Sequence, residues 1–105
     1  MEELLSLAKE TLGIVSTATA KDASLKMLIN SCIADLKRAG IKADAEKADD
    51  LIRNTIMIYV KANFGISNPD YKAKYMEAYQ LHIAKLSLSG DYKEAEKWLM
   101  LHVSW

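Results

Sequence analysis

The sequence predicts an all-α fold, a small bundle of four main helices with a short C-terminal helix or an extended tail. One proline and four glycines in 105 residues leave little room for long loops. Apolar residues recur at spacings of three and four over four separate stretches, as on the inner faces of helices. A chain of this length can bury one modest core, so we treat residues 1–105 as a single domain.

The stretch from Asp49 to Gly65 is predicted to be the central helix. It opens with carboxylates and closes with a glycine, as helix ends prefer. Its apolar residues cover a surface too wide for one neighbour: Ile52, Ile56, Tyr59 and Asn63 on one face, with Leu51, Thr55, Ile58 and Ala62 beside them. We expect a helix on each flank, and the surplus face around Met57 and Val60 meets the first helix or another subunit.

A first helix is predicted from Glu2 to Leu12, and Gly13 is its expected stop. Leu4, Leu5, Ala8 and Leu12 share its apolar face. The next seven residues are small or β-branched and form helices poorly. They are predicted to form a loop, or an extended segment that packs Ile14 and Val15 on the core.

A second helix is predicted from Ala23 to Ala39, with Asp22 as its N-cap and Gly40 in the left-handed position after it. The link that follows is short, which favours an antiparallel hairpin with the central helix. Within that link, Asp44 is a candidate cap for the central helix.

The fourth helix is predicted from Pro69 to Leu88, because proline is favoured at the first helical position. Its stripe contains Tyr71, Tyr75, Ala78, Tyr79, His82 and Leu86, and Leu81, Ile83 and Leu88 are expected to widen it. A capping box at Asp91 to Glu94 predicts a short fifth helix reaching Trp98. The alternation that follows also fits a strand, so the last residues stay open.

Composition limits the classes of function. Lys plus Arg and Asp plus Glu both number 14, so the formal net charge is zero, whereas nucleic-acid binders usually have a basic excess. A single cysteine, Cys32, excludes an intrachain disulfide and fits a reducing cytoplasm. The acidic start does not resemble a secretory signal, and the longest apolar run, Ile56 to Val60, is too short for a membrane helix. We expect no membrane association.

Enzymatic chemistry has little support. His82 and His102 are far apart and lack partners at metal-ligand spacing, and Cys32 lies within an apolar helix stripe, where cysteine packs as a small hydrophobe. Asp49 and Asp50 point about 100° apart on a helix, so they fit helix-terminal charges better than a metal pair. Asp49 and Arg53 could form an ion pair. The sequence therefore predicts no catalytic residue, no cofactor and no metal.

A small helical nucleic-acid-binding regulator is the alternative function. The links at Gly40 and Gly65 are short, as in helix-turn-helix proteins. Tyrosines could stack on single-stranded bases beside lysines: Tyr71, Tyr75, Tyr79 and Tyr92 with Lys72, Lys74 and Lys85. However, the spacing of four between the first three tyrosines favours the core or a subunit contact, and no helix carries a cluster of groove-reading side chains.

The end of the chain is unusually rich in large apolar side chains. Trp98, Met100 and Trp105 lie close together there, and Tyr92 precedes them. Tryptophan and methionine are enriched at protein interfaces. These four residues either pack back on the bundle or form a subunit interface.

The helical segments resemble small phage and prophage head–tail connector proteins, also called DNA-packaging or head-completion proteins. The resemblance extends from Glu2 to Tyr92. It rests on an Asp-led helix ending in Asp35-Leu36 before Gly40-Ile41, a central helix ending in Tyr59-Val60 and Phe64-Gly65, and a final Leu86-Ser87-Leu88-Ser89-Gly90-Asp91-Tyr92.

This resemblance implies a structural virion component without catalysis, assembled in the bacterial host cytoplasm. Such proteins form a homo-oligomeric ring between the portal and the tail or adaptor proteins. DNA passes through the ring and is contacted through shape and charge, without base reading. The resemblance supplies no catalytic or cofactor-binding residue.

Overall fold

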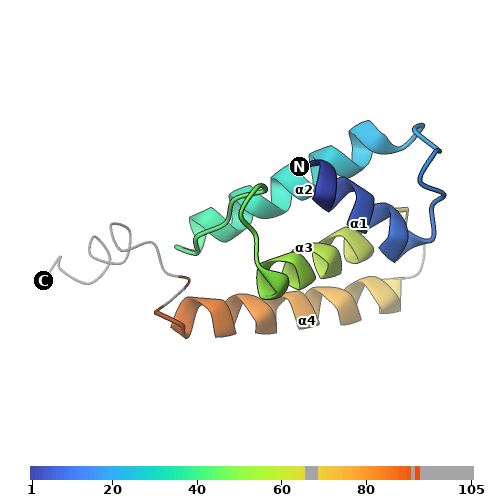
Figure 1. Cartoon of the computed structure of the whole chain (residues 1–105). Coiled ribbons are helices and arrows are strands. Elements are labelled where there is room, and N and C mark those ends of the chain that lie inside the picture. Colours follow the sequence, from blue (N-terminus) through green and yellow to red (C-terminus); the bar gives the residue numbers. More distant parts are fainter. Residues whose placement is uncertain (66–68, 91, 93–105) are drawn as a thin grey trace, which may run out of the picture.

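The computed structural model describes residues 1–65, 69–90 and 92. These residues form four α-helices joined by loops: α1 (Glu2–Leu12), α2 (Asp22–Arg38), α3 (Asp50–Asn63) and α4 (Pro69–Leu88), as Figure 1 shows. The all-α bundle is therefore confirmed, and the predicted bounds of the first and last helices agree with α1 and α4. The expected fifth helix or tail lies outside the described residues.

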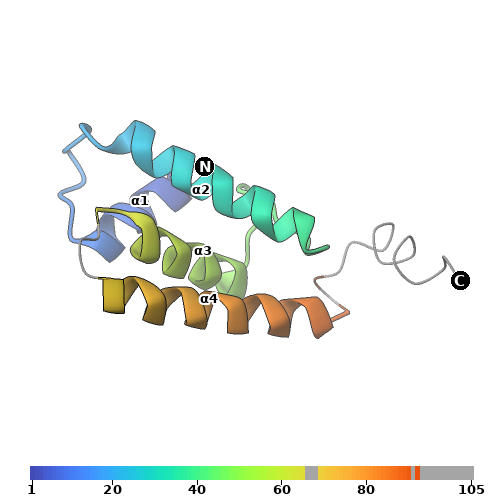
Figure 2. The ribbon, with the colours of Figure 1, turned by 180° about the vertical axis from the view of Figure 1, so that it is seen from behind.

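Helix α3 is the central helix, as predicted. It contacts α1, α2 and α4, and Figures 1 and 2 show α4 running along one side of α3 with α1 and α2 on the other. Its expected surplus face is used within the chain, because Met57 and Val60 are both buried. The core consists mainly of aliphatic side chains from all four helices and the α2–α3 link.

Two of the helices end as their glycines predict. Gly13 has φ 73° and Gly40 has φ 81°, a region in which a side chain is strained. After Gly40 the chain reverses, and the Ile41 N–H donates to the Leu36 carbonyl at 3.0 Å. Ile41 is completely buried, so the hydrophobic contact expected beside this cap is present.

The predicted N-caps of α2 and α3 are wrong. Asp22 is the first residue of α2, and its carboxylate makes an ion pair with Lys9. Asp44 accepts a hydrogen bond from the Glu46 N–H within the link, whereas the Asp49 carboxylate accepts from the Ile52 N–H at 3.0 Å and caps α3. Both aspartates suit a cap chemically, and the position at which the link turns into the helix selects Asp49.

The α1–α2 connection is a loop held at its base by a buried charge pair. Lys9 is only 6% exposed, and its ammonium lies 2.7 Å from Asp22 Oδ1. The same ammonium donates to the Ser16 carbonyl at 3.3 Å. Of the two predicted alternatives the loop is found, in which Ile14 packs against the core and Val15 is exposed.

A polar contact joins α2 to α4 inside the bundle. Tyr79 of α4 is completely buried, and its hydroxyl donates to Asp35 Oδ2 at 2.6 Å. The Cys32 thiol donates to the same hydroxyl at 3.7 Å, and the Tyr59 ring lies 5.2 Å from the Tyr79 ring, centroid to centroid. Helices α2, α3 and α4 thus meet at one side chain.

No helix among residues 1–65, 69–90 and 92 is long and apolar enough to cross a membrane.

Candidate functional site

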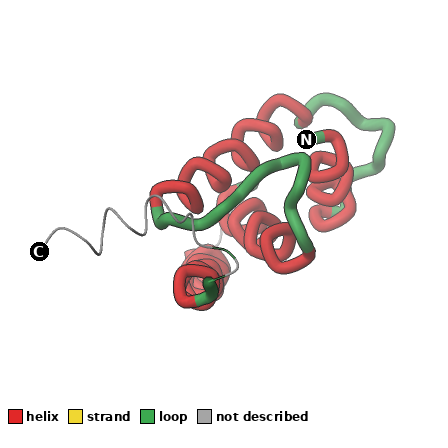
Figure 3. Tube along the Cα trace, turned by 60° about the vertical axis from the view of Figure 1, so that its left-hand side comes forward, coloured by secondary structure: helices red, strands yellow, loops and turns green. Residues whose placement is uncertain are grey.

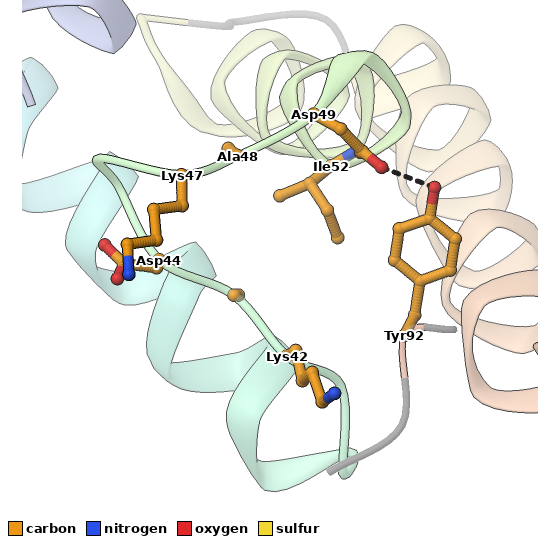
Figure 4. A pocket seen from close by; sticks show the side chains of 8 residues that line it. Lys42, Asp44, Lys47, Ala48, Asp49, Ile52 and Tyr92 are labelled. Atoms are coloured by element: carbon orange, nitrogen blue, oxygen red, sulfur yellow. Dashed lines mark hydrogen bonds between the residues drawn. The ribbon is translucent and has the colours of Figure 1, made fainter. Parts of the chain in front are cut away.

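Tyr92 closes one end of the bundle, where the α2–α3 link meets the chain leaving α4. Its hydroxyl donates to Asp49 Oδ2 at 2.5 Å, and its carbonyl accepts from the Lys42 N–H at 2.6 Å. Figure 4 shows the Tyr92 side chain on one side of a hollow, joined to Asp49 at the start of α3, with Asp44 and Lys47 of the α2–α3 link on the other side. Both the side chain and the backbone of Tyr92 therefore bind the segment that follows α4 to the α2–α3 link and the start of α3.

The Asp49 carboxylate accepts the hydrogen bonds that connect Tyr92 to the start of α3. The Tyr92 hydroxyl and then the Ile52 N–H stabilise this carboxylate, and these bonds lower the pKa of Asp49 below its usual 3.8. The Asp49 carboxylate thus serves as both the α3 cap and the Tyr92 acceptor. The Arg53 guanidinium instead forms its ion pair with Glu3, at 2.9 Å, so the expected Asp49–Arg53 pair is replaced by a bond between α3 and α1.

The hollow beside Tyr92 has a volume of about 350 Å³. It is lined by Lys42, Ala43, Asp44, Lys47, Ala48, Asp49, Ile52 and Tyr92. Charges of both signs surround it, and Asp49 is already occupied by two hydrogen bonds. The lining therefore combines apolar and charged side chains and points to no particular ligand.

Cys32 is a core residue, as predicted. It is completely buried, and burial raises the pKa of its thiol to about 12, so it is not a thiolate at neutral pH. His82 is half-buried, with Nδ1 2.9 Å from the Ala78 carbonyl of its own helix. His102 lies outside the described residues. Within the part of the chain that the structure describes, no three His, Cys, Asp or Glu side chains could hold a metal ion.

The tyrosine stripe divides along α4. Tyr79 is buried and Tyr75 is half-buried, with the Lys61 ammonium 5.4 Å from its ring centroid. Tyr71 is exposed. Of the two predicted alternatives, the core holds for Tyr79, whereas Tyr71 lies outside the core of the chain and a subunit contact stays a prediction for it.

The solvent-facing side of α4 carries large apolar side chains that the sequence pattern predicted on the inner stripe of the helix. Leu81 and Leu88 are 60% and 82% exposed, so the expectation that they widen the inner stripe is wrong. On a helix with about 100° per residue, both point nearly opposite to Tyr79. We call their surroundings the α4 outer face, which comprises Lys74, Glu77, Leu81, Ala84, Lys85 and Leu88, all exposed.

The sequence offered a signal for this face. Leu81 and Leu88 are seven residues apart, so they share one side of the helix, whereas Tyr79 and Leu86 form a second pair seven apart on the other side. Of the four residues predicted to form a subunit interface, Tyr92 is the one that the structure places. Trp98, Met100 and Trp105 lie outside the described residues.

The described residues define a small all-α protein that exposes several large apolar side chains, among them Leu81 and Leu88. Residues 4–93 match the model of the family described as phage connector protein, and the chain belongs to this family. The head–tail connector resemblance seen in the sequence is thereby confirmed. The comparison with curated proteins and the comparison with solved structures each returned no match.

The family gives the chain a structural role in a phage, as a connector that interacts with other head or tail proteins. Membership also implies a virion component. A structural family of this kind suggests a protein that does not catalyse a reaction.

Proposed function

We propose that the chain assembles as a ring between the portal of the phage head and the tail or its adaptor proteins, where it completes the head after DNA packaging. The family match over residues 4–93 is the observation that carries this proposal. The zero net charge supports it, because low net charge gives little repulsion between copies. Exposed leucines on α4 also support a subunit that contacts others.

DNA passes through the proposed ring without being read. Lysines and acidic residues share the exposed part of α4, where Lys72, Lys74 and Lys85 lie on the same helix as Asp70 and Glu77. We expect the isolated chain to bind duplex DNA weakly at low salt and to lose that binding as salt rises. A tight, sequence-dependent complex in a retardation assay would instead favour the nucleic-acid-binding regulator.

The sequence-based proposal that Tyr92, Trp98, Met100 and Trp105 contact a neighbouring subunit stands beside this one. Tyrosine, tryptophan and methionine are enriched in the buried centres of interfaces. Replacement of Trp98 and Trp105 by serine should reduce incorporation into particles while leaving the helical circular dichroism signal of the chain unchanged.

Deletion of the gene from the phage or prophage tests the proposed function. The expected result is heads that package DNA but remain without tails, seen by negative-stain electron microscopy and cured by a plasmid copy of the gene. Tailed, infectious particles in normal yield without the gene would contradict the proposal. If the deletion prevented the heads from forming, rather than the attachment of tails to finished heads, the chain would act at an earlier step and the proposal would be contradicted as well.

A further inference from the structure

The α4 outer face presents an apolar centre with charges around it. Leu81 protrudes from the middle of the face and is 60% exposed. Lys74 lies seven residues before it and Lys85 four after it, on the same side of the helix, and Glu77 lies four before it. Asp70, exposed and eleven residues before Leu81, lies on this side of the helix as well, so the side carries two positive and two negative charges around a leucine.

A hollow on α1 also combines a leucine with charges of both signs. It has a volume of about 350 Å³ and is lined by Glu3, Ser6, Leu7, Glu10 and Arg53. Leu7 is half-buried and packs against the core, so it gives the hollow an apolar floor. Glu3 is paired with Arg53 at 2.9 Å, and Glu10 is exposed. We call these five residues the α1 hollow, with two negative charges and one positive charge around a leucine.

We propose that the α4 outer face of one copy docks into the α1 hollow of the next copy, with Leu81 against Leu7 and the lysines of α4 beside Glu3 and Glu10. The occupant is a second copy of this chain, because its own α4 carries a protruding leucine and exposed lysines that can meet Glu10, while Glu3 is already paired with Arg53. The inference rests on the proposed ring assembly and names the surfaces that would build it. Complementary charge sets the register of such contacts, and the leucines supply the buried centre.

The two surfaces lie on different sides of the subunit. Helix α4 packs on α3, and Figures 1 and 3 show α1 on the far side of α3 from α4. Each copy can therefore use its α4 outer face toward one neighbour and its α1 hollow toward another. A contact between two different patches is head-to-tail and propagates into a closed ring or a filament, whereas a contact of one patch with itself stops at a dimer.

Cysteine cross-linking tests the contact directly in the full chain. Ser6→Cys places a thiol in the α1 hollow and Ala84→Cys places one on the α4 outer face without removing Leu81, and the buried Cys32 stays out of reach. Under mild oxidation we expect a disulfide dimer from a mixture of the two variants and a ladder of oligomers from the double variant. Each single variant alone should give no dimer. Disulfides form only where the two Cα atoms come within about 7 Å, so the pattern reports this contact.

Three results would overturn the inference. They are a dimer of Ala84→Cys with itself, which would show that α4 pairs with α4; no dimer in the mixture; and a chain that sediments as a monomer even at millimolar concentration. The matched control is Val15→Cys, an exposed position outside both surfaces, which should not cross-link with either variant.

Charge exchange gives a second, independent readout. Glu10→Lys and Lys85→Glu should each weaken self-association in sedimentation velocity by about tenfold, and the combination should restore most of it. Lys21 is exposed and lies outside both surfaces, so Lys21→Glu should leave self-association unchanged. Equal effects of Glu10→Lys and Lys21→Glu, or no rescue in the double variant, would contradict the inference.

Failure of this inference is distinguishable from failure of the proposed function. If the cross-links are absent while gene deletion still leaves heads without tails, the connector role stands and the subunits meet through other surfaces. If the cross-links form while tailed particles assemble without the gene, the pairing stands and the head-completion role fails.

Discussion

Removal of one hydroxyl from the centre of the bundle gives the most informative stability test. Tyr79→Phe keeps the buried ring and its contact with Tyr59, but removes the donor to Asp35 Oδ2 and the acceptor of the Cys32 thiol. A hydrogen bond to a charged group contributes about 1.5–3 kcal/mol to stability. The Asp35 side chain is 35% exposed and can regain water, so we expect a loss near the lower end, about 1.5 kcal/mol.

The assay is urea unfolding followed by circular dichroism, with Tyr71→Phe as the matched control. Tyr71 lies on the same helix, is 59% exposed and should change stability by less than about 0.5 kcal/mol. Tyr79→Ala should cost about 3–5 kcal/mol, because it also leaves a cavity in the core. If Tyr79→Phe is no more destabilising than Tyr71→Phe, the polar contact between α2 and α4 contributes nothing and the reasoning is refuted.

Three further predictions concern charge. Lys9→Met should destabilise the chain by about 2–3 kcal/mol in the same unfolding assay, because it leaves the largely buried Asp22 carboxylate without its cation, and a loss below 0.5 kcal/mol would contradict this. The lowered pKa of Asp49 stabilises the fold above its ordinary pKa of 3.8, and this contribution is lost as the pH falls through the lower pKa of the folded state. Tyr92→Phe removes the main cause of the lowered pKa and should therefore reduce the acid-dependent part of the unfolding midpoint. An unchanged pH profile of stability would argue against the bond. The pKa of the Cys32 thiol is raised from 9.0 to about 12, so the thiol stabilises the fold below about pH 9 and loses that contribution as the pH rises toward 12. Cys32→Ala should reduce this loss of stability at alkaline pH. Fast thiol labelling of the native chain would contradict the burial of Cys32.

The helices were predictable because their signals are local. Apolar spacing and the proline at position 69 define α4, and the left-handed glycines at 13 and 40 mark where α1 and α2 end. The choice between Asp44 and Asp49 as the α3 cap was not local, because either side chain can accept a backbone N–H. The direction in which the link approaches α3 decides it, and that direction depends on packing.

The surfaces were harder to predict than the helices. Leu81 and Leu88 were assigned to the core from hydrophobicity alone, although helical geometry places them opposite Tyr79. The rotation of about 100° per residue is therefore enough to show that these two leucines do not belong to the inner stripe. By contrast, the Lys9–Asp22 pair joins two helices across a loop, and nothing in the spacing of these residues in the sequence indicates that contact.

Electron cryomicroscopy of the intact particle is the most direct test of the central claim that the chain is a head–tail connector whose copies meet head to tail. We expect a ring of four-helix subunits between the portal and the tail, with α4 of each copy against α1 of the next. Density for the chain at another position in the particle, or its absence from the purified particle, would contradict the connector role. A ring at the expected position in which α4 faces away from the neighbouring α1 would contradict the proposed contact.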